Sequence, residues 1–240
     1  MSVARAILDA ARRRFPAAYE RTRRMAALPR GVAAWYVHRL RGGDGEEEAY
    51  DQQFWDYHSG GDWDGFARVL LRHAPARSVL DVGCGDGKLL ASVLSVAPGT
   101  RVLGIDSSPT ALRVARGRGV ETREVDLAGI RRSEAGRVAR EVGGFDLSVS
   151  LETVEHFPPW HAGKLLRLVA CAPVVAFSAA QPGQGGTLHV NERPVEHWVR
   201  AFRRLGYGVS ERNDAVRADV RTLDLPPWYG ANVNLFVRRG

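Results

Sequence analysis

The stretch Val79-Leu80-Asp81-Val82-Gly83-Cys84-Gly85-Asp86-Gly87 decides how this chain folds. Apolar residues around a single aspartate predict a buried strand, and the apolar pattern that follows predicts a helix. Gly83, Gly85 and Gly87 lack a β-carbon and tolerate positive φ, so they can form a tight turn between the two elements. A strand, a glycine turn and a helix start together make a pocket in which a ligand approaches bare backbone.

A second acidic residue, Asp106, ends the run RVLGID at 101–106, which predicts the next strand. It lies about 20 residues beyond the glycine turn, the offset at which an acid accepts hydrogen bonds from ribose hydroxyls in nucleotide-binding βαβ units. A nicotinamide dinucleotide is the competing ligand. That interpretation gives Asp81 no role, and the spacing here is G-x-G-x-G instead of G-x-G-x-x-G.

Strands and helices alternate along the rest of the chain. Helix starts are indicated by Ser108 followed by Pro109, by Pro158-Pro159 and by Pro194. The alternation predicts an α/β fold, a doubly wound and mostly parallel seven-stranded sheet of Rossmann-like type with helices on both faces. Strands are expected at 78–82, 102–106, 121–126, 145–150, 173–178, 207–211 and 233–238.

The domain organisation expected from the sequence is an N-terminal helical extension or lid, residues 1–73, followed by a nucleotide-binding domain, residues 74–240. Proline breaks and the glycine joint at 42–45 divide the extension. The helix expected at 62–73 is placed outside the nucleotide-binding core. Trp228 and Tyr229 are expected to cover the sheet edge, with a wall of the acceptor pocket as the alternative.

Composition narrows the class of protein. The 240 residues are 45% hydrophobic, enough for a sizeable core, and carry a net charge of +7. This charge comes almost entirely from arginine, because Lys88 and Lys164 are the only lysines, so it is discounted as a sign of nucleic-acid binding.

Cys84 and Cys171 form neither a disulfide framework nor a metal-ligand spacing, which suits a reducing, cytoplasmic compartment. No apolar stretch reaches the roughly 20 residues that span a membrane.

The segments VLDVGCGDG and GIDSSPTAL resemble the first two motifs of class I S-adenosylmethionine-dependent methyltransferases, and the resemblance extends from residue 79 to residue 156. It implies an enzyme whose cofactor is S-adenosylmethionine. In that family the glycine turn passes the methionine part of the cofactor and the acid ending the second strand holds the ribose. Asp126 is implied as the adenine contact, with a helix-cap role as the alternative. The cofactor-binding residues that the resemblance implies are Asp81, Gly83, Cys84, Gly85, Gly87, Asp106, Ser107, Asp126, Leu127 and Leu151.

The segment SLETVEHF at 150–157 resembles the part of many small-molecule methyltransferases that borders both methionine and acceptor. A hydroxyl acceptor must lose a proton, and a histidine with a pKa near neutrality suits that task. His156 is the first candidate and His189, in the loop 178–193, is the second. A structural role for His156 and a capping role for His189 are the alternatives. The substrate-binding candidates are Glu152, Gln181, Gln184, His189 and Asn191. No metal is expected, because no set of carboxylates and histidines converges in sequence near His156.

The expected function is methyl transfer from S-adenosylmethionine to an oxygen, with nitrogen less favoured, of a small polar metabolite. The segment AAQPGQGGTLHVNERPVEHW at 179–198 resembles a subgroup associated with sugars, glycans and natural products. One alternative is a nucleic-acid methyltransferase whose basic N-terminal helices dock on phosphates. The missing Asn-Pro-Pro-Tyr-like segment and Pro-Cys pair after the fourth strand argue against it. Also open are a non-catalytic cofactor-binding module, membrane-surface contact through residues 1–41, and a homodimer.

Overall fold

A computed structural model of the chain describes residues 60–186 and 188–240. The chain divides into two compact units, Met1–Gly45 and Glu46–Gly240, and the description below concerns the second. The helices and the basic arm expected at 1–41 lie outside the described residues. Within the described part, no helix is both long and apolar enough to cross a membrane.

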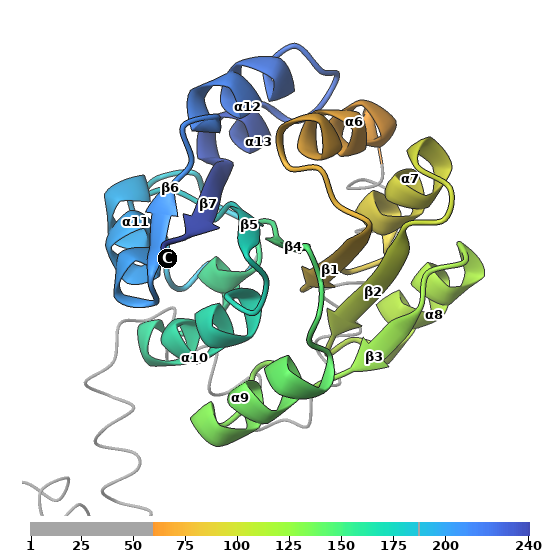
Figure 1. The fold of residues 1–240 in the computed structure, drawn as a ribbon. Helices are drawn as coiled ribbons and strands as arrows, with labels where there is room; N and C mark the ends of the chain where they lie inside the picture. The colour runs from red at the N-terminus through yellow and green to blue at the C-terminus, as the bar shows by residue number, and fades with distance from the viewer. Residues whose placement is uncertain (1–59, 187) are drawn as a thin grey trace, which may run out of the picture. The chain divides into compact units, whose positions relative to one another are not determined.

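The described chain is built on one seven-stranded sheet with the order β3-β2-β1-β4-β5-β7-β6 (Figure 1). The strands β1 to β5 pair in parallel, and β7 runs antiparallel to both of its neighbours. This confirms the predicted doubly wound, mostly parallel α/β fold. The strands are β1 (Ser78–Val82), β2 (Arg101–Asp106), β3 (Thr122–Glu124), β4 (Leu147–Ser150), β5 (Val174–Phe177), β6 (Tyr207–Val209) and β7 (Asn234–Arg238).

Helices cover both faces of the sheet, with α6, α7 and α8 on one side and α9, α10 and α11 on the other (Figure 1). The predicted start of α8 is confirmed, because the Ser108 hydroxyl oxygen accepts a hydrogen bond from the Ala111 amide at 3.2 Å. The helices are α6 (Trp63–His73), α7 (Lys88–Val96), α8 (Pro109–Gly117), α9 (Arg132–Glu141), α10 (Pro159–Val169), α11 (Val195–Arg204), α12 (Asn213–Val220) and α13 (Pro227–Asn232), with a short 3-10 turn η1 (Val154–His156).

The last two strands, expected at 207–211 and 233–238, pair antiparallel at one edge of the sheet, with Tyr207 opposite Arg238. They do not form a simple hairpin, because α12 and α13 lie between them in the chain. The sequence did not predict these two short helices. They pack against the rest of the domain from the side of α6 (Figure 1).

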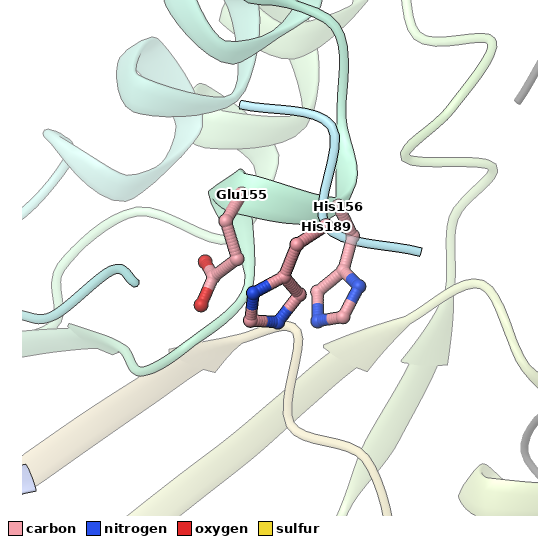
Figure 2. A group of neighbouring side chains, drawn as sticks. All are labelled: Glu155, His156 and His189. Atoms are coloured by element: carbon pink, nitrogen blue, oxygen red, sulfur yellow. The ribbon is translucent and has the colours of Figure 1, made fainter. Parts of the chain in front are cut away.

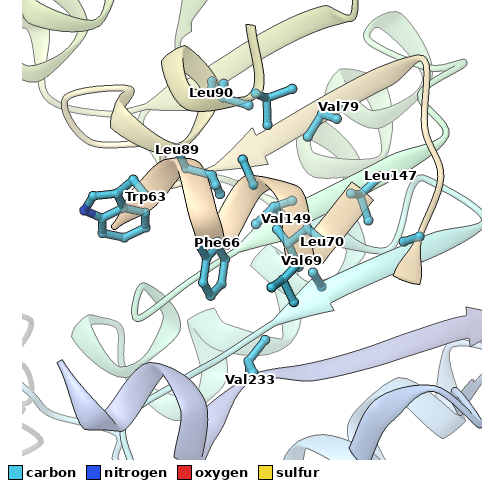
Figure 3. Packing of buried hydrophobic residues seen from close by; sticks show 14 of the residues in the cluster. Trp63, Phe66, Val69, Leu70, Val79, Leu89, Leu90, Leu147, Val149 and Val233 are labelled. Carbon is cyan, nitrogen blue, oxygen red and sulfur yellow. The ribbon is translucent and has the colours of Figure 1, made fainter. Parts of the chain in front are cut away.

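Helix α6 belongs to the hydrophobic core of the sheet domain. Its Phe66 is fully buried and Leu70 is 1% exposed, and both join a cluster with Val79 of β1 and Val149 of β4 (Figure 3). The expectation that residues 62–73 lie outside the core is therefore wrong. The reason is the apolar stripe of α6, which covers a sheet face that would otherwise meet water. The division into compact units falls after Gly45, and the domain boundary expected after residue 73 stays a prediction.

Candidate active site

The turn between β1 and α7 has the backbone that the sequence predicted. Its three glycines have positive φ, with values of 81° at Gly83, 52° at Gly85 and 73° at Gly87. The Gly83 amide donates to the Ile105 carbonyl at 2.7 Å, which ties the turn to β2. A β-carbon on Gly83 would lie 2.3 Å from Cγ2 of Thr153, so glycine is required there. This close approach also shows that the turn touches the segment after β4.

Asp106 closes the turn from the end of β2. Its Oδ2 accepts a hydrogen bond from the Gly85 amide at 2.9 Å, and its Oδ1 accepts one from the Ser108 amide at 3.0 Å. Burial raises the pKa of Asp106, while these backbone hydrogen bonds oppose the rise. Each carboxylate oxygen can accept more than one hydrogen bond, so the group can also receive two hydroxyls. Ser107, beside it, is half-buried.

Asp81 is buried in β1, with 5% of its surface exposed. Burial, together with the negative charge of Asp106, raises the pKa of Asp81 to about 8. A buried carboxylate beside a second, half-buried one is costly, and a ligand that brings hydroxyl donors and a positive charge relieves that cost. S-adenosylmethionine carries ribose hydroxyls and an ammonium group, so these residues fit it.

The remaining cofactor candidates have less direct support. The Cys84 thiol packs against β2, since a β-carbon on Gly104 would lie 2.6 Å from its Sγ, and burial raises its pKa well above the usual range. Leu127 is buried, and Leu151 is half-buried beyond β4. Asp126 is exposed, and its Oδ1 accepts from the Gly129 amide at 2.8 Å within a turn, whereas the next helix, α9, has Arg131 as its N-cap. The adenine contact of Asp126 stays a prediction.

Three of the predicted substrate residues meet in one polar network. Glu152 accepts a hydrogen bond from Nε2 of Gln184 at 2.7 Å, and Nε2 of Gln181 donates to Oδ1 of Asn232 at 2.8 Å. Asn232 joins the two pairs, because its Nδ2 donates to Oε1 of Gln184 at 2.8 Å and lies 3.2 Å from Oε1 of Glu152. The structure therefore brings these residues together, although their contact with substrate stays a prediction.

The backbone at Glu152 is unusual for a non-glycine residue, with φ of 48°. Its amide donates to Oγ of Ser178 at 3.1 Å, which holds the strained residue at the end of β4. Burial raises the pKa of Glu152, while hydrogen bonds from Gln184, Ser178 and Asn232 work in the opposite direction. Strained backbone of this kind persists where the surroundings over-determine it, often at functional sites.

The two candidate bases lie side by side. The rings of His156 and His189 are edge-to-face with centroids 4.8 Å apart, although they come from η1 and from the loop after β5 (Figure 2). The loop reaches η1 because the Val190 and Asn191 amides both donate to the Glu155 carbonyl, at 2.9 and 3.0 Å. The Glu155 side chain is completely buried beside the two rings.

Glu192 orients His189. One of its oxygens lies 3.2 Å from Nδ1 of His189, and the Gly183 and Gly185 amides each donate to the carboxylate at 2.8 Å. Burial works against ionisation, but these hydrogen bonds hold the pKa of Glu192 below its usual range. An ionised Glu192 stabilises the tautomer of His189 that carries its proton on Nδ1, which leaves Nε2 as an acceptor. Asn191 is buried, and its Oδ1 accepts from Nε of Arg193 at 2.9 Å.

Tyr229 of α13 packs against α6 and is affected by the charged groups of the site. Its ring packs edge-on against Trp63, with centroids 5.2 Å apart. Burial raises the pKa of Tyr229, and the charges of Glu152, Glu155 and Asp81 add to the rise. The ring also packs edge-on against Phe66, with centroids 6.1 Å apart, so Tyr229 rests on the core that α6 forms. A role as a wall of the acceptor pocket stays a prediction.

Sequence reasoning missed several residues of this site. Glu155 lies in the segment 150–157 and Glu192 in the loop 178–193, but an acid near a histidine in sequence does not show which atoms face each other. Asn232 is the last residue of α13, and nothing local marks it as a partner of Glu152, 80 residues away. Only the sheet topology brings these residues to one edge.

Comparisons with known proteins agree with this geometry. A family model described as a methyltransferase domain matches residues 79–172. A ubiquinone biosynthesis O-methyltransferase of Xanthomonas oryzae pv. oryzae is 38% identical over 176 residues, which cover 68% of this chain and 72% of the relative. The protein of the same name from Burkholderia thailandensis is 38% identical over 87 residues, 36% of each chain, so this chain spans about a third of the length of the curated relatives that match first.

Solved structures share the fold. An amino pentose methyltransferase from Micromonospora echinaspora, involved in calicheamicin biosynthesis and solved with S-adenosylmethionine bound, superposes with a TM-score of 0.56. The superposition covers 79% of this chain and 98% of that one, at 18% identity. The chain belongs to the class I S-adenosylmethionine-dependent methyltransferases, as the glycine turn and the two aspartates predicted. The family and its cofactor, S-adenosylmethionine, are thereby confirmed.

Proposed function

We propose that this chain is an enzyme that transfers a methyl group from S-adenosylmethionine to a hydroxyl oxygen, with nitrogen less favoured, of a small polar metabolite. The observation that carries the proposal is the contact between the two halves of the site. Gly83 of the donor turn abuts Thr153, in the segment that supplies Glu152 and His156. A methyl group held at the turn therefore lies next to polar side chains that can hold an acceptor.

On the donor side, this chain's residues bind and orient the cofactor. Asp106 receives the ribose hydroxyls while it keeps the Gly85 and Ser108 amides in place. The ionised form of Asp81 attracts the ammonium group. When bound, S-adenosylmethionine supplies an electrophilic methyl group on a sulfonium whose thioether is a good leaving group. Alignment of the nucleophile with that methyl group can supply several kcal/mol of the barrier reduction.

On the acceptor side, the network of Glu152, Gln181, Gln184 and Asn232 presents both donors and acceptors to a molecule rich in hydroxyls. His189, held through Nδ1 by Glu192, offers Nε2 to the acceptor hydroxyl proton. The acceptor oxygen then forms the new bond to the methyl carbon as the sulfur–methyl bond breaks. His156 lies beside His189 and is the second group able to take the proton.

The names of the relatives support an oxygen acceptor, since the matched curated proteins are named O-methyltransferases. The structural neighbour that acts on an amino pentose supports a sugar or a natural product, in agreement with the resemblance of the segment 179–198. We therefore propose that the substrate is a sugar-containing metabolite and that the enzyme acts in the cytoplasm.

The test is incubation of the full chain with methyl-labelled S-adenosylmethionine and a metabolite extract, followed by identification of labelled products by mass. We expect label in a small hydroxyl-bearing molecule, with reduced label for Asp106→Asn when the cofactor is not saturating. His161→Gln, a histidine of α10 outside the site, serves as the matched control and keeps full labelling. Label in RNA or DNA would support the nucleic-acid alternative, and bound cofactor with no labelled product would support a non-catalytic module.

A further inference from the structure

We infer that Glu155, His156 and His189 bind a divalent metal cation of borderline softness, such as Mn²⁺, Fe²⁺, Co²⁺ or Zn²⁺. Each residue offers one ligand atom, and the three atoms lie within 4.8 Å of one another. Figure 2 shows the His189 ring between the Glu155 carboxyl group and the His156 ring. Metal–nitrogen bonds of about 2.0–2.1 Å form after only small rotations of such side chains.

The Glu155 carboxylate is the strongest sign of a ligand. Its side chain is fully buried, and Oε1 accepts a hydrogen bond from the Ala180 amide at 3.0 Å. Its other oxygen, Oε2, is buried without a hydrogen-bond partner among the described residues. A buried polar atom that lacks a partner is costly, and folded proteins rarely leave one unexplained. A cation bound to Oε2 accounts for it.

The surroundings of His189 have the form expected around a metal-ligating histidine. Such a histidine usually donates its other ring N–H to a carboxylate, which fixes the ring and its tautomer. Glu192 does this at Nδ1, and the Gly183 and Gly185 amides fix Glu192 in turn. Gly186 leaves room for the ring, since a β-carbon there would lie 2.5 Å from Nε2 of His189. The atom left for the cation is then Nε2.

The charge balance also favours a cation. Glu152 lies close enough to Glu155 for its negative charge to act on the Glu155 carboxyl group. The Glu152 oxygens accept hydrogen bonds from Gln184 and Asn232, so Glu152 stays outside the ligand set as a neighbouring negative charge. A buried and a half-buried carboxyl group beside two imidazole rings form a site whose negative charge a doubly charged cation neutralises.

Two imidazoles and one carboxylate are a ligand set that leaves positions open on the metal. If the proposed function holds, the open positions receive the acceptor hydroxyl, whose pKa the cation lowers by acting as a Lewis acid. The hydroxyl proton then passes to solvent, and the oxygen forms the bond to the methyl carbon as the sulfur–methyl bond breaks. In this state His156 and His189 are ligands and neither is the base.

No local sequence pattern predicts this site, because one of its three ligands is distant in the chain. Glu155 and His156 are neighbours, but His189 follows more than 30 residues later, beyond β5. The pairing of the loop backbone with Glu155 brings the third ligand into place. The inference replaces the expectation that the site holds no metal.

The test is titration of the EDTA-treated full chain with Co²⁺, followed by visible absorption and by calorimetry. We expect one Co²⁺ bound per chain at micromolar concentration, with a d–d spectrum that reports nitrogen ligands. His156→Gln and His189→Gln should each weaken binding at least 10-fold, and so should the isosteric Glu155→Gln, which keeps an acceptor for the Ala180 amide. His161→Gln is the control and should bind like the wild type.

Absence of a Co²⁺ spectrum and of binding heat up to millimolar concentration would overturn the inference. So would unchanged Co²⁺ affinity in the His156 and His189 variants, whose fold is checked by circular dichroism. The two proposals fail separately. Methyl transfer at an undiminished rate in EDTA refutes the role of the cation and leaves the proposed function intact, whereas Co²⁺ binding without any labelled product keeps the metal site and refutes the function.

Discussion

At the scale of single residues, the proposed donor site depends on two aspartates, one buried and one half-buried. Asp81 lies within β1 and Asp106 ends β2, and the negative charge of Asp106 raises the pKa of Asp81. Asp106 also accepts hydrogen bonds from the Gly85 and Ser108 amides, so it shapes the turn in addition to its proposed role of receiving the ribose. These roles are separable by substitution.

Asp106→Asn should weaken binding of S-adenosylhomocysteine by about 1–3 kcal/mol, roughly 5- to 150-fold in Kd, because a carboxylate that accepts several hydrogen bonds loses one acceptor oxygen. Isothermal titration calorimetry measures the effect. Asp146→Asn is the control, since Asp146 bonds Ser78 at the opposite end of β1. Equal losses in both variants would show that the effect is a general loss of structure.

Asp81 should make stability depend on pH in the cofactor-free protein. Its pKa is about 8 in the folded chain against an ordinary value of 3.8, so the folded state holds a proton that the unfolded state has lost between these values. Stability from this group is therefore lost as pH rises from 4 to 8, by up to about 1.4 kcal/mol per pH unit. Asp81→Asn removes the dependence. In denaturant unfolding, the free energy of unfolding of the wild type should fall from pH 5 to pH 8 relative to that of Asp81→Asn. The same pH dependence in both proteins would contradict the assignment.

At the scale of elements, the β1–α7 turn is the part whose geometry leaves least freedom. Gly83→Ala meets both a φ of 81° and a contact of 2.3 Å with Thr153, so it should displace the turn and abolish cofactor binding. Gly99→Ala is the matched control, because Gly99 has a φ of 89° with open space around it. Both variants should lose roughly 1–2 kcal/mol through backbone strain, but only Gly83→Ala should lose binding in a calorimetric titration. Retained binding in Gly83→Ala would show that the turn does not approach Thr153 in solution.

Helix α6 was expected outside the core, and its contribution to the free energy of unfolding can be measured. Phe66→Ala should cost about 3–5 kcal/mol in the free energy of unfolding, because Phe66 is fully buried in the core. Arg68→Ala, on the exposed side of the same helix, should change the free energy by less than about 0.5 kcal/mol. A loss below 1 kcal/mol for Phe66→Ala in urea unfolding would show that α6 is a peripheral extension and not part of the core.

At the scale of the whole molecule, the strand order explains which predictions succeeded. The strand at 78–82, the glycine turn and Asp106 are local patterns, and periodicity with turn chemistry was enough to place them. The core role of Phe66 and the pairing of Asn232 with Glu152 depend on contacts between distant segments, which no local pattern encodes. The meeting of His189 with Glu155 and His156 is of the same kind, because it follows from the neighbouring positions of β4 and β5 in the sheet.

A crystal structure of the chain with S-adenosylhomocysteine tests most directly whether the donor and acceptor sites share one edge of the sheet. We expect the ribose hydroxyls within hydrogen-bonding distance of Asp106, and the sulfur between the glycine turn and the group formed by Glu155, His156 and His189. A crevice without ligand at saturating concentration, or a ligand bound away from Asp106, would contradict the proposed site.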